Sequence, residues 1–253
     1  MKHYPRFICV FLLFIVLSGC AQEQEQIVVP VAGRIADREQ QKIDLRANLA
    51  QTFPKLGEPE LNAIDSIARA FFVANVARHR AYMDYALPIG SEQTTLKMSD
   101  IGFVLSEIGI KPADQILEIG TGTGYLTAIL SRLGAQIYSV EINEYLSEIA
   151  RQNMKRYSLS NVHIRNADGL EGWSRFAPYD VVIITASVRQ IPDEIMAQLK
   201  PGARIAVPIR DEDGTCRWMI YQTKGEEKEI EEIASRESNV PDAILPVVVT
   251  PEE

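Results

Sequence analysis

The stretch Ile116-Leu117-Glu118-Ile119-Gly120-Thr121-Gly122-Thr123-Gly124-Tyr125 decides the fold of this chain of 253 residues. It reads as an apolar strand, a glycine-rich turn and the start of a helix. Glycine is needed in such a turn because the backbone must bend tightly and approach a ligand with no Cβ in the way. The spacing is G-x-G-x-G, whereas the dinucleotide fingerprint is G-x-G-x-x-G, and Tyr125 stands where the third glycine of that fingerprint would be. The turn therefore predicts a ligand site and disfavours a bound pyrophosphate.

Short β-rich runs alternate with helical patterns around this stretch, which is typical of βαβ units and a parallel sheet. The strands are expected at 115–119, 136–141, 162–166, 181–185 and 203–208, and the helices at 125–132, 144–157 and 193–199. Two more β-like runs, 217–223 and 228–233, flank a turn at Lys224-Gly225 and predict an antiparallel hairpin at the sheet edge. The sequence thus predicts an α/β fold with a doubly wound, mostly parallel sheet.

Helices are expected before the sheet. Spaced Ile and Leu residues in 35–53 predict a surface helix, which ends at Phe53-Pro54. Residues 60–85 are predicted to hold a second and a third helix. Their apolar face is expected to comprise Ile64, Ile67, Phe71 and Phe72. Together with the sheet, these helices make one domain over residues 35–253.

The first 20 residues have the layout of a signal peptide. Lys2 and Arg6 precede an apolar run, and Leu17-Ser18-Gly19-Cys20 resembles the lipobox at which a bacterial signal peptidase cuts before a lipidated cysteine. The run is shorter than the roughly 20 residues that span a bilayer. We expect a lipoprotein-type signal over 1–20, a linker over 21–34 and a lipid anchor at Cys20, on the periplasmic or cell-surface side of a membrane. The alternative is an uncleaved N-terminal anchor.

Composition and charge narrow the class of function. Hydrophobic residues make up 46% and charged residues 24% of the chain, as in a globular protein. The net charge is −8 with no long Lys/Arg run, which disfavours nucleic acid as a partner. His3, His79 and His163 are isolated in the sequence, so no metal site is expected. We expect a monomer.

Three acidic residues near the ends of the predicted strands are candidate ligand contacts. Glu118, two positions before the first glycine, suits a cationic ligand such as S-adenosylmethionine, with its sulfonium and amino groups. Glu141 ends the second strand about 20 residues past the turn, where an acid accepts hydrogen bonds from ribose hydroxyls. Asp168, in Asp168-Gly169, follows the third strand and is placed to reach an adenine amino group. The alternatives are a solvated strand end for Glu141 and a simple turn for Asp168-Gly169.

These residues, with Tyr179-Asp180 and the apolar run after it, resemble the motifs of class I S-adenosylmethionine-dependent methyltransferases, which have a Rossmann-like fold. A further set of motifs is similar to protein-L-isoaspartate O-methyltransferases over roughly residues 60–210. The matching motifs are Arg80-Ala81-Tyr82, Ala86-Leu87-Pro88-Ile89-Gly90, Gln93-Thr94, Gly172-Trp173, Ala177-Pro178-Tyr179-Asp180, Ile191-Pro192 and Val207-Pro208.

The resemblance implies an enzyme that transfers a methyl group from S-adenosylmethionine to the carboxylate of L-isoaspartyl residues in damaged proteins. The resulting ester collapses to a succinimide, which begins repair. The candidate catalytic residues are Thr94 and Thr95, in the loop that faces the acceptor in the family. The candidate cofactor-binding residues are Glu118, Gly120, Thr121, Gly122, Gly124, Tyr125, Glu141, Asp168 and Gly169.

The acceptor loop departs from the family pattern. The family usually reads Gly-Gln-Thr-Ile-Ser-Gln-Pro, whereas this chain has Glu92-Gln93-Thr94-Thr95-Leu96-Lys97-Met98. Leu96 replaces a serine hydroxyl, and Thr95 supplies a substitute only if the loop shifts its register by one residue. Glu92 adds a negative charge near an anionic acceptor unless Lys97 neutralises it. The family's Arg-Phe-Val-Pro-Leu is matched only loosely at 243–247, without the arginine.

Two alternatives follow from these departures and from the signal. The chain is either a membrane-tethered protein of methyltransferase fold with another acceptor, or one without catalytic activity. The family's usual location, the cytoplasm, is the alternative to a lipoprotein outside it, because S-adenosylmethionine is made in the cytoplasm.

Overall fold

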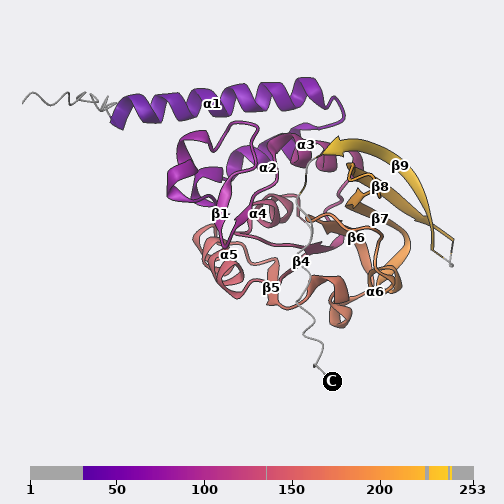
Figure 1. Ribbon diagram of the computed structural model, residues 1–253. Coiled ribbons are helices and arrows are strands. Elements are labelled where there is room, and N and C mark those ends of the chain that lie inside the picture. Colours follow the sequence, from indigo (N-terminus) through magenta and orange to yellow (C-terminus); the bar gives the residue numbers. More distant parts are fainter. Residues whose placement is uncertain (1–30, 135, 226–227, 239, 241–253) are drawn as a thin grey trace, which may run out of the picture.

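The computed structural model describes residues 31–134, 136–225, 228–238 and 240 (Figure 1). The helices are α1 (Val31–Thr52), α2 (Glu58–Ser66), α3 (Met98–Ile108), α4 (Tyr125–Arg132), α5 (Glu144–Arg156) and α6 (Asp193–Ala197), with short 3-10 turns η1 (Arg69–Phe71), η2 (Asn75–Arg80), η3 (Gly169–Glu171) and η4 (Ser174–Phe176). The strands are β1 (Pro88–Gly90), β2 (Gln93–Thr94), β3 (Gln115–Ile119), β4 (Gln136–Glu141), β5 (Val162–Asn166), β6 (Tyr179–Ile184), β7 (Leu199–Arg210), β8 (Cys216–Lys224) and β9 (Glu229–Ser238). The predicted signal at 1–20, most of the linker and the stretch 243–247 lie outside the described residues.

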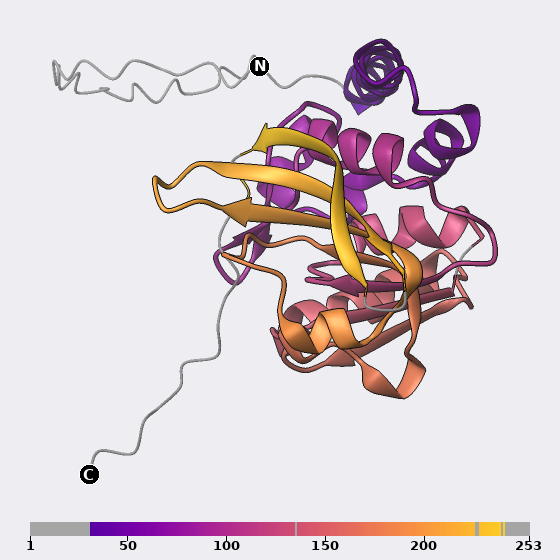
Figure 2. The ribbon, with the colours of Figure 1, turned by 90° about the vertical axis from the view of Figure 1, so that its right-hand side faces the viewer.

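The large sheet has the strand order β5-β4-β3-β6-β7-β8-β9. The strands from β5 to β7 are parallel, and β8 and β9 are antiparallel. The chain runs outward from β3 through β4 to β5 and then returns to β6 on the other side of β3. This reversal is the switch point at which doubly wound sheets bind ligands, beyond the carboxyl ends of their strands. The predicted doubly wound sheet and the edge hairpin are confirmed, and Figure 2 shows β8 and β9 extending from the parallel part.

Alternation along the strands divides the core into two layers. Ile116 belongs to the layer under α1 to α4, whereas Leu117 and Ile119 belong to the opposite layer, which includes Ile195 of α6. Successive side chains of a strand point to opposite faces, so β3 contributes to both layers. By the same alternation the side chain of Glu118 points to the face of the sheet that α4 covers, where it contacts Thr127.

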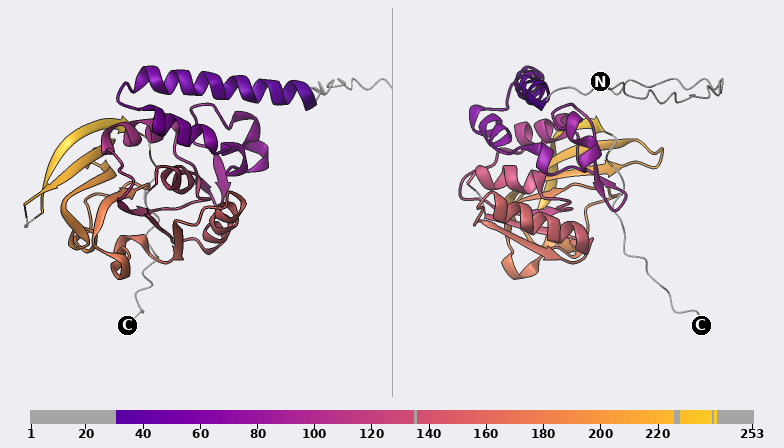
Figure 3. Two further views of the ribbon diagram at one scale, coloured as in Figure 1. Left: turned by 180° about the vertical axis from the view of Figure 1, so that it is seen from behind. Right: turned by 90° about the vertical axis from the view of Figure 1, so that its left-hand side faces the viewer.

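The helical segment before the sheet is partly as expected. The helix α1 begins at Val31, four residues before the predicted start, and lies along the outside of the helical layer (Figures 1 and 3). The predicted second helix is confirmed as α2, whereas the predicted third helix and the single apolar face are wrong. Helix α2 ends at Ser66 because Ile67 takes an extended conformation (φ −111°, ψ 111°), and two 3-10 turns follow. Phe71 is 49% exposed, while Ile64, Ile67 and Phe72 are buried.

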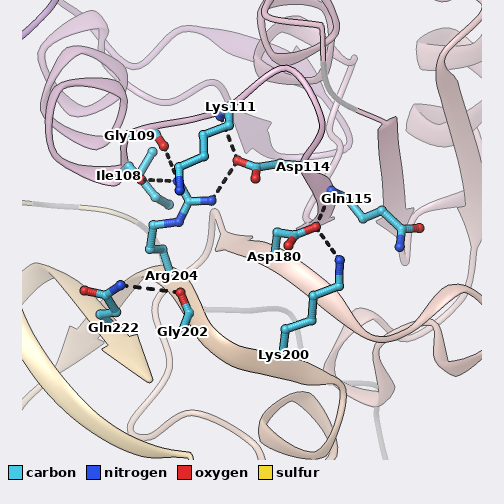
Figure 4. Close-up of polar contacts among 10 residues, drawn as sticks. All are labelled: Ile108, Gly109, Lys111, Asp114, Gln115, Asp180, Lys200, Gly202, Arg204 and Gln222. Atoms are coloured by element: carbon cyan, nitrogen blue, oxygen red, sulfur yellow. Dashed lines mark hydrogen bonds and ion pairs between the residues drawn. The ribbon is translucent and has the colours of Figure 1, made fainter. Parts of the chain in front are cut away.

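A polar network fastens the sheet at the amino ends of its central strands (Figure 4). Arg204 of β7 donates to Asp114 Oδ2 at 2.7 Å and to the carbonyl oxygens of Ile108 and Gly109, where α3 ends. Lys200 Nζ lies 2.7 Å from Asp180 Oδ2 of β6. The network is therefore at the opposite end of the strands from the switch point.

Candidate active site

One pocket lies over the carboxyl ends of β3, β4 and β6 and brings both predicted halves of the site together. Eight of the nine predicted cofactor residues line it, with Gly124 as the exception, and so do both predicted catalytic threonines. Further lining residues come from β1 and the acceptor loop, from α3, α5 and η3, and from the ends of β4 and β6. They include Ile89, Gln93, Leu96, Ile101, Ile142, Leu146, Leu170, Thr185 and Ala186.

The glycine turn forms the floor of the pocket. Gly120, Gly122 and Gly124 have φ angles of 93°, 55° and 90°, a region that favours glycine. A Cβ on Gly120 would lie 2.2 Å from Thr185 Oγ1, and one on Gly124 would lie 2.7 Å from Met154 Cε. The missing side chain of Gly124 thus lets α4 pack closely against α5. Gly122 lines the pocket with its backbone. The turn has the closely approachable backbone that the expected cofactor needs.

Thr185 fixes this turn from the neighbouring strand. Its hydroxyl contacts the carbonyl oxygens of Gly120 at 2.8 Å and Ile119 at 3.0 Å, and its N–H donates to Ile119 at 2.9 Å. From the sequence Thr185 is expected only as the last residue of a strand, with no role in the site. The available signal was its position directly after β6, beside the glycine turn across the switch point.

Glu141 is placed at the pocket wall at the end of β4, as predicted. Its carboxylate accepts the Gly122 N–H at 2.7 Å through Oε2 and the Asn143 N–H at 2.9 Å through Oε1. Burial raises the pKa of Glu141, and the hydrogen bonds from backbone N–H groups oppose this shift. Each carboxylate oxygen has a second lone pair, so Glu141 retains capacity to accept ribose hydroxyls.

Glu118 is fully buried beneath the glycine turn. Its Oε2 accepts hydrogen bonds from Thr127 Oγ1 at 2.5 Å and Ser139 Oγ at 2.6 Å, and Ser139 Oγ lies 2.6 Å from Thr121 Oγ1. Its Oε1 has no partner among the described residues. Burial raises the pKa of Glu118 to about 7, against the lowering effect of the Ser139 and Thr127 hydroxyls. Glu118 is thus an acid poised to respond to a cation in the pocket.

The raised pKa of Glu118 predicts a pH-dependent stability. Above its ordinary pKa of 4.5 and below about 7, the folded chain retains a proton that the unfolded chain has released. Raising the pH through this range therefore lowers the free energy of unfolding, by up to about 3 kcal/mol. We expect Glu118→Gln to remove this decline, as measured by urea unfolding at about pH 4.5 and about pH 8. Glu148→Gln, on the exposed face of α5, is the control, and an equal pH dependence in parent and Glu118→Gln would refute the assignment.

Asp168 and Gly169, which the sequence analysis expects near an adenine, line the pocket after the end of β5. Asp168 is half-buried, and its Oδ1 accepts the Leu170 N–H at 2.9 Å, which caps the turn η3. A Cβ on Gly169 would lie 2.4 Å from Ile119 Cγ2, so only glycine fits against β3 there. The pair is therefore both a turn and a lining element of the pocket.

The two predicted catalytic threonines have different surroundings. Thr94 is exposed and lines the pocket mouth from β2. Thr95 is buried, and its Oγ1 accepts hydrogen bonds from Arg69 Nη2 at 2.7 Å and from Leu87 N at 3.1 Å. Leu96 is half-buried and contributes an apolar surface to the pocket. Thr94 is therefore the hydroxyl free to face an acceptor, and Thr95 has a structural partner, Arg69, that the sequence analysis did not identify.

The turn between β1 and β2 holds two non-glycine residues at positive φ, Ser91 at 50° and Glu92 at 59°. Such a turn favours glycine, which gives a backbone reason for the glycine that the family pattern has at the position of Glu92. No ion pair joins Glu92 and Lys97 in the described part of the chain. The charge of Glu92 is thus left beside the acceptor side of the pocket without the neutralising contact considered above.

Comparison with known proteins agrees with this geometry. The family described as Protein-L-isoaspartate(D-aspartate) O-methyltransferase (PCMT) matches residues 44–241. A protein-L-isoaspartate O-methyltransferase of Salinibacter ruber is 35% identical over 189 residues, covering 70% of this chain and 82% of the relative. One of the same name from Anaeromyxobacter sp. is 41% identical over 150 residues, covering 59% and 71%.

Solved structures of similar fold include members of the same family. A protein-L-isoaspartate O-methyltransferase superposes with a TM-score of 0.69 at 25% identity, covering 80% of this chain and 65% of that one. The fold is also shared with a Plasmodium falciparum protein, described as a putative member in complex with S-adenosyl-L-homocysteine, with a TM-score of 0.65 at 16% identity over 79% of this chain and 96% of that one. With the glycine turn, Glu141 and the acceptor loop around one pocket, this chain belongs to the protein-L-isoaspartate(D-aspartate) O-methyltransferase family.

Proposed function

We propose that this chain transfers a methyl group from S-adenosylmethionine to the free carboxylate of L-isoaspartyl residues in proteins or peptides, and so begins their repair. The observation that carries the proposal is the shared pocket. The glycine turn and Glu141 line it on one side, and Thr94 of the acceptor loop lines its mouth on the other. A donor and an acceptor bound to the two sides would therefore meet in one pocket.

The residues present fit the cofactor. Gly122 lines the pocket with backbone that a ligand can approach closely, and Glu141, which also lines it, is expected to accept the ribose hydroxyls. Asp168 lines the pocket where the adenine is expected. Buried Glu118, with its unpartnered Oε1, supplies negative potential beneath the turn when it is ionised, and its ionised form favours a cationic ligand over a neutral one.

Positioning is the main task left to the chain. When bound, S-adenosylmethionine supplies a methyl group on a positively charged sulfur, which is already activated for transfer. The acceptor carboxylate is ionised at neutral pH and attacks through its own oxygen, so no general base is required. The chain has to hold that oxygen in line with the methyl group and to exclude water. Such positioning is worth about 7–11 kcal/mol of the barrier in favourable cases.

The direct test is transfer of labelled methyl from S-adenosylmethionine to an isoaspartyl peptide, with the normal aspartyl peptide as the control acceptor. We expect base-labile label on the isoaspartyl peptide alone. Cofactor binding without methyl transfer to this peptide would refute the proposed repair activity. Calorimetric binding of S-adenosylhomocysteine, measured on the same preparation, distinguishes that outcome from an inactive fold.

A second candidate function is methyl transfer to a different acceptor. The observation that favours it is Leu96, which lines the pocket with an apolar side chain where the family pattern has a serine. Thr95 does not replace that serine, because its hydroxyl is engaged by Arg69 and Leu87. Loss of label on the isoaspartyl peptide, together with label on another carboxylate, would select this candidate.

The charge and backbone of Glu92 predict a gain from Glu92→Gly. Removing an exposed negative charge near the acceptor should lower the KM for an isoaspartyl peptide about two- to fivefold, since such charges contribute up to about 1 kcal/mol. Glycine also relieves the positive φ of 59°, which raises the free energy of unfolding by about 0.5–1 kcal/mol. Glu92→Gln separates the two effects, because it should lower KM without stabilising the fold. Steady-state kinetics and urea unfolding measure both, and an unchanged KM in both variants would contradict the charge effect.

We also propose that the chain acts as a monomer tethered to a membrane through Cys20. The basic and apolar pattern before the lipobox supports this location. None of the helices among the described residues has the length and apolar character to cross a membrane. Incorporation of labelled palmitate into the parent but not into Cys20→Ser would support the anchor, and its absence from both would refute it.

A further inference from the structure

Arg69 is a fully buried cation next to the acceptor side of the pocket. Its guanidinium nitrogens donate to five oxygens, all from the segment between residues 81 and 96. These are Ala81 O at 3.0 Å, Met83 O at 3.2 Å, Tyr85 O at 2.9 Å, Thr95 Oγ1 at 2.7 Å and Leu96 O at 2.7 Å. One side chain thus ties the beginning of this segment to its end.

The acceptors of Arg69 are unusual for a buried guanidinium, because none is a carboxylate in the described part of the chain. Burial lowers the pKa of Arg69, and the negative charge of Asp84 opposes this shift without forming an ion pair with Arg69 among the described residues. A fixed fork of N–H donors is, however, suited to several carbonyl oxygens in different directions. The hydrogen bonds of Arg69 therefore stabilise the conformation of one loop, residues 81–96, which contains the β1–β2 hairpin.

The loop that Arg69 closes forms part of the pocket wall. Thr95 and Leu96, two of its hydrogen-bond partners, line the pocket, and its Cζ lies 5.7 Å from the ring centroid of Tyr125, another lining residue. Arg69 lies in the turn η1, and the residue directly after this turn is Phe72. The carbonyl oxygen of Phe72 accepts a hydrogen bond from the Thr123 hydroxyl of the glycine turn at 2.6 Å. One short segment thus holds the acceptor loop and the glycine turn at a fixed separation.

We propose that Arg69 is a positioning residue for the acceptor, an inference that rests on the proposed methyl transfer. It holds residues 94–96 at the pocket mouth, so that the acceptor carboxylate enters at the correct place relative to the glycine turn. Its positive charge, which Asp84 offsets in part, adds a favourable potential for an anionic acceptor. Arg69 acts through the loop and does not itself line the pocket.

Two substitutions separate the fork from the charge. Arg69→Lys keeps the charge but offers a single nitrogen in place of the planar fork, and Arg69→Met removes both. Arg217→Met is the matched control, because Arg217 lies on β8 in an exposed ion pair with Asp211. Each variant is assayed for KM and kcat with an isoaspartyl peptide, for calorimetric affinity for S-adenosylhomocysteine, and for hydrogen exchange of amides 81–96.

We expect Arg69→Lys to raise the peptide KM about tenfold, and Arg69→Met to raise it further, because hydrogen bonds from a charged donor are lost. Exchange should accelerate within 81–96 and remain unchanged in β3 and β4. The affinity for S-adenosylhomocysteine should change less than about threefold, since the pocket floor is intact. The Arg217→Met control should resemble the parent in all three readouts.

Three results would overturn the proposal: an unchanged KM with unchanged exchange in 81–96, a loss of cofactor affinity as large as the rise in KM, or the same changes in Arg217→Met. If Arg69→Met does not fold, Arg69→Lys and Thr95→Val carry the test, with Thr95→Ser expected to restore the parent values. If the parent transfers no methyl to the peptide, the proposed function fails by itself. Faster exchange confined to 81–96 would still support the loop clamp, and unchanged exchange would overturn it.

Discussion

Gly120→Ala is expected to abolish cofactor binding and to lower the free energy of unfolding by about 2–5 kcal/mol. A methyl group at this position would lie 2.2 Å from Thr185 Oγ1 and would be attached to a backbone with a φ of 93°. Thr185 must then release the carbonyl oxygens of Gly120 and Ile119, and the turn moves away from the pocket floor. Urea unfolding measures the first effect, and calorimetry with S-adenosylhomocysteine measures the second.

Gly202→Ala is the matched control for the backbone effect. Gly202 has a comparable φ of 78°, but a Cβ there would meet no atom within 4 Å. This variant should therefore cost only the conformational strain of about 1–2 kcal/mol, with unchanged affinity for S-adenosylhomocysteine. Equal destabilisation of both variants, with cofactor binding retained in Gly120→Ala, would mean that the contact with Thr185 does not shape the pocket.

Arg204→Met is expected to lower the free energy of unfolding by about 3–5 kcal/mol, because it strands the buried carboxylate of Asp114. The two side chains are 11% and 6% exposed, and their contact at 2.7 Å is the main compensation for burying both charges. After the substitution, Asp114 Oδ2 retains the Lys111 N–H at 2.7 Å as a neutral donor. The network lies at the amino ends of the strands, so the peptide KM of the folded variant should equal that of the parent.

Two comparisons test whether the stranded charge is the cause. Adding Asp114→Asn to Arg204→Met should recover part of the lost stability, since the remaining group is then neutral. Lys200→Met removes the partner of Asp180 from a pair that is 33% and 25% exposed, and should cost only about 0–1 kcal/mol. If Lys200→Met costs as much as Arg204→Met, burial of the ion pair is not the deciding factor.

The centre of the parallel sheet could be predicted from sequence because β3, β4 and β6 are buried on both faces. The expected bounds of β3, β4 and β5 agree with the structure, since each is a short run bounded by clear turn signals. β7 is longer than expected, 199–210 in place of 203–208. Its register shifts opposite Tyr179 and Val181, so that residues expected to end a helix continue the strand. An irregularity of pairing between distant segments has no local signal.

The candidate site was predicted where one short motif determines it. The glycine turn and Glu141 occupy the expected pocket, because a strand followed by a tight turn fixes both positions locally. Glu118 was assigned to a cationic ligand, and strand alternation alone would have placed it beneath α4, where it lies. Arg69 could not be identified, because its partners are 12 to 27 residues away and are mostly carbonyl oxygens, which every residue has.

The outer edge of β9 has a consequence for the behaviour of the protein in concentrated solution. Among the described residues β9 pairs only with β8, so its other side presents free backbone groups to a neighbouring molecule. Such edges template aggregation unless something opposes it. Along this strand the exposed side chains include Glu229, Glu231, Glu232 and Glu237. Two copies that approached edge to edge would bring these like charges together, and their repulsion opposes aggregation through this edge. About 1 M salt shortens the Debye length to about 3 Å and should therefore weaken the repulsion.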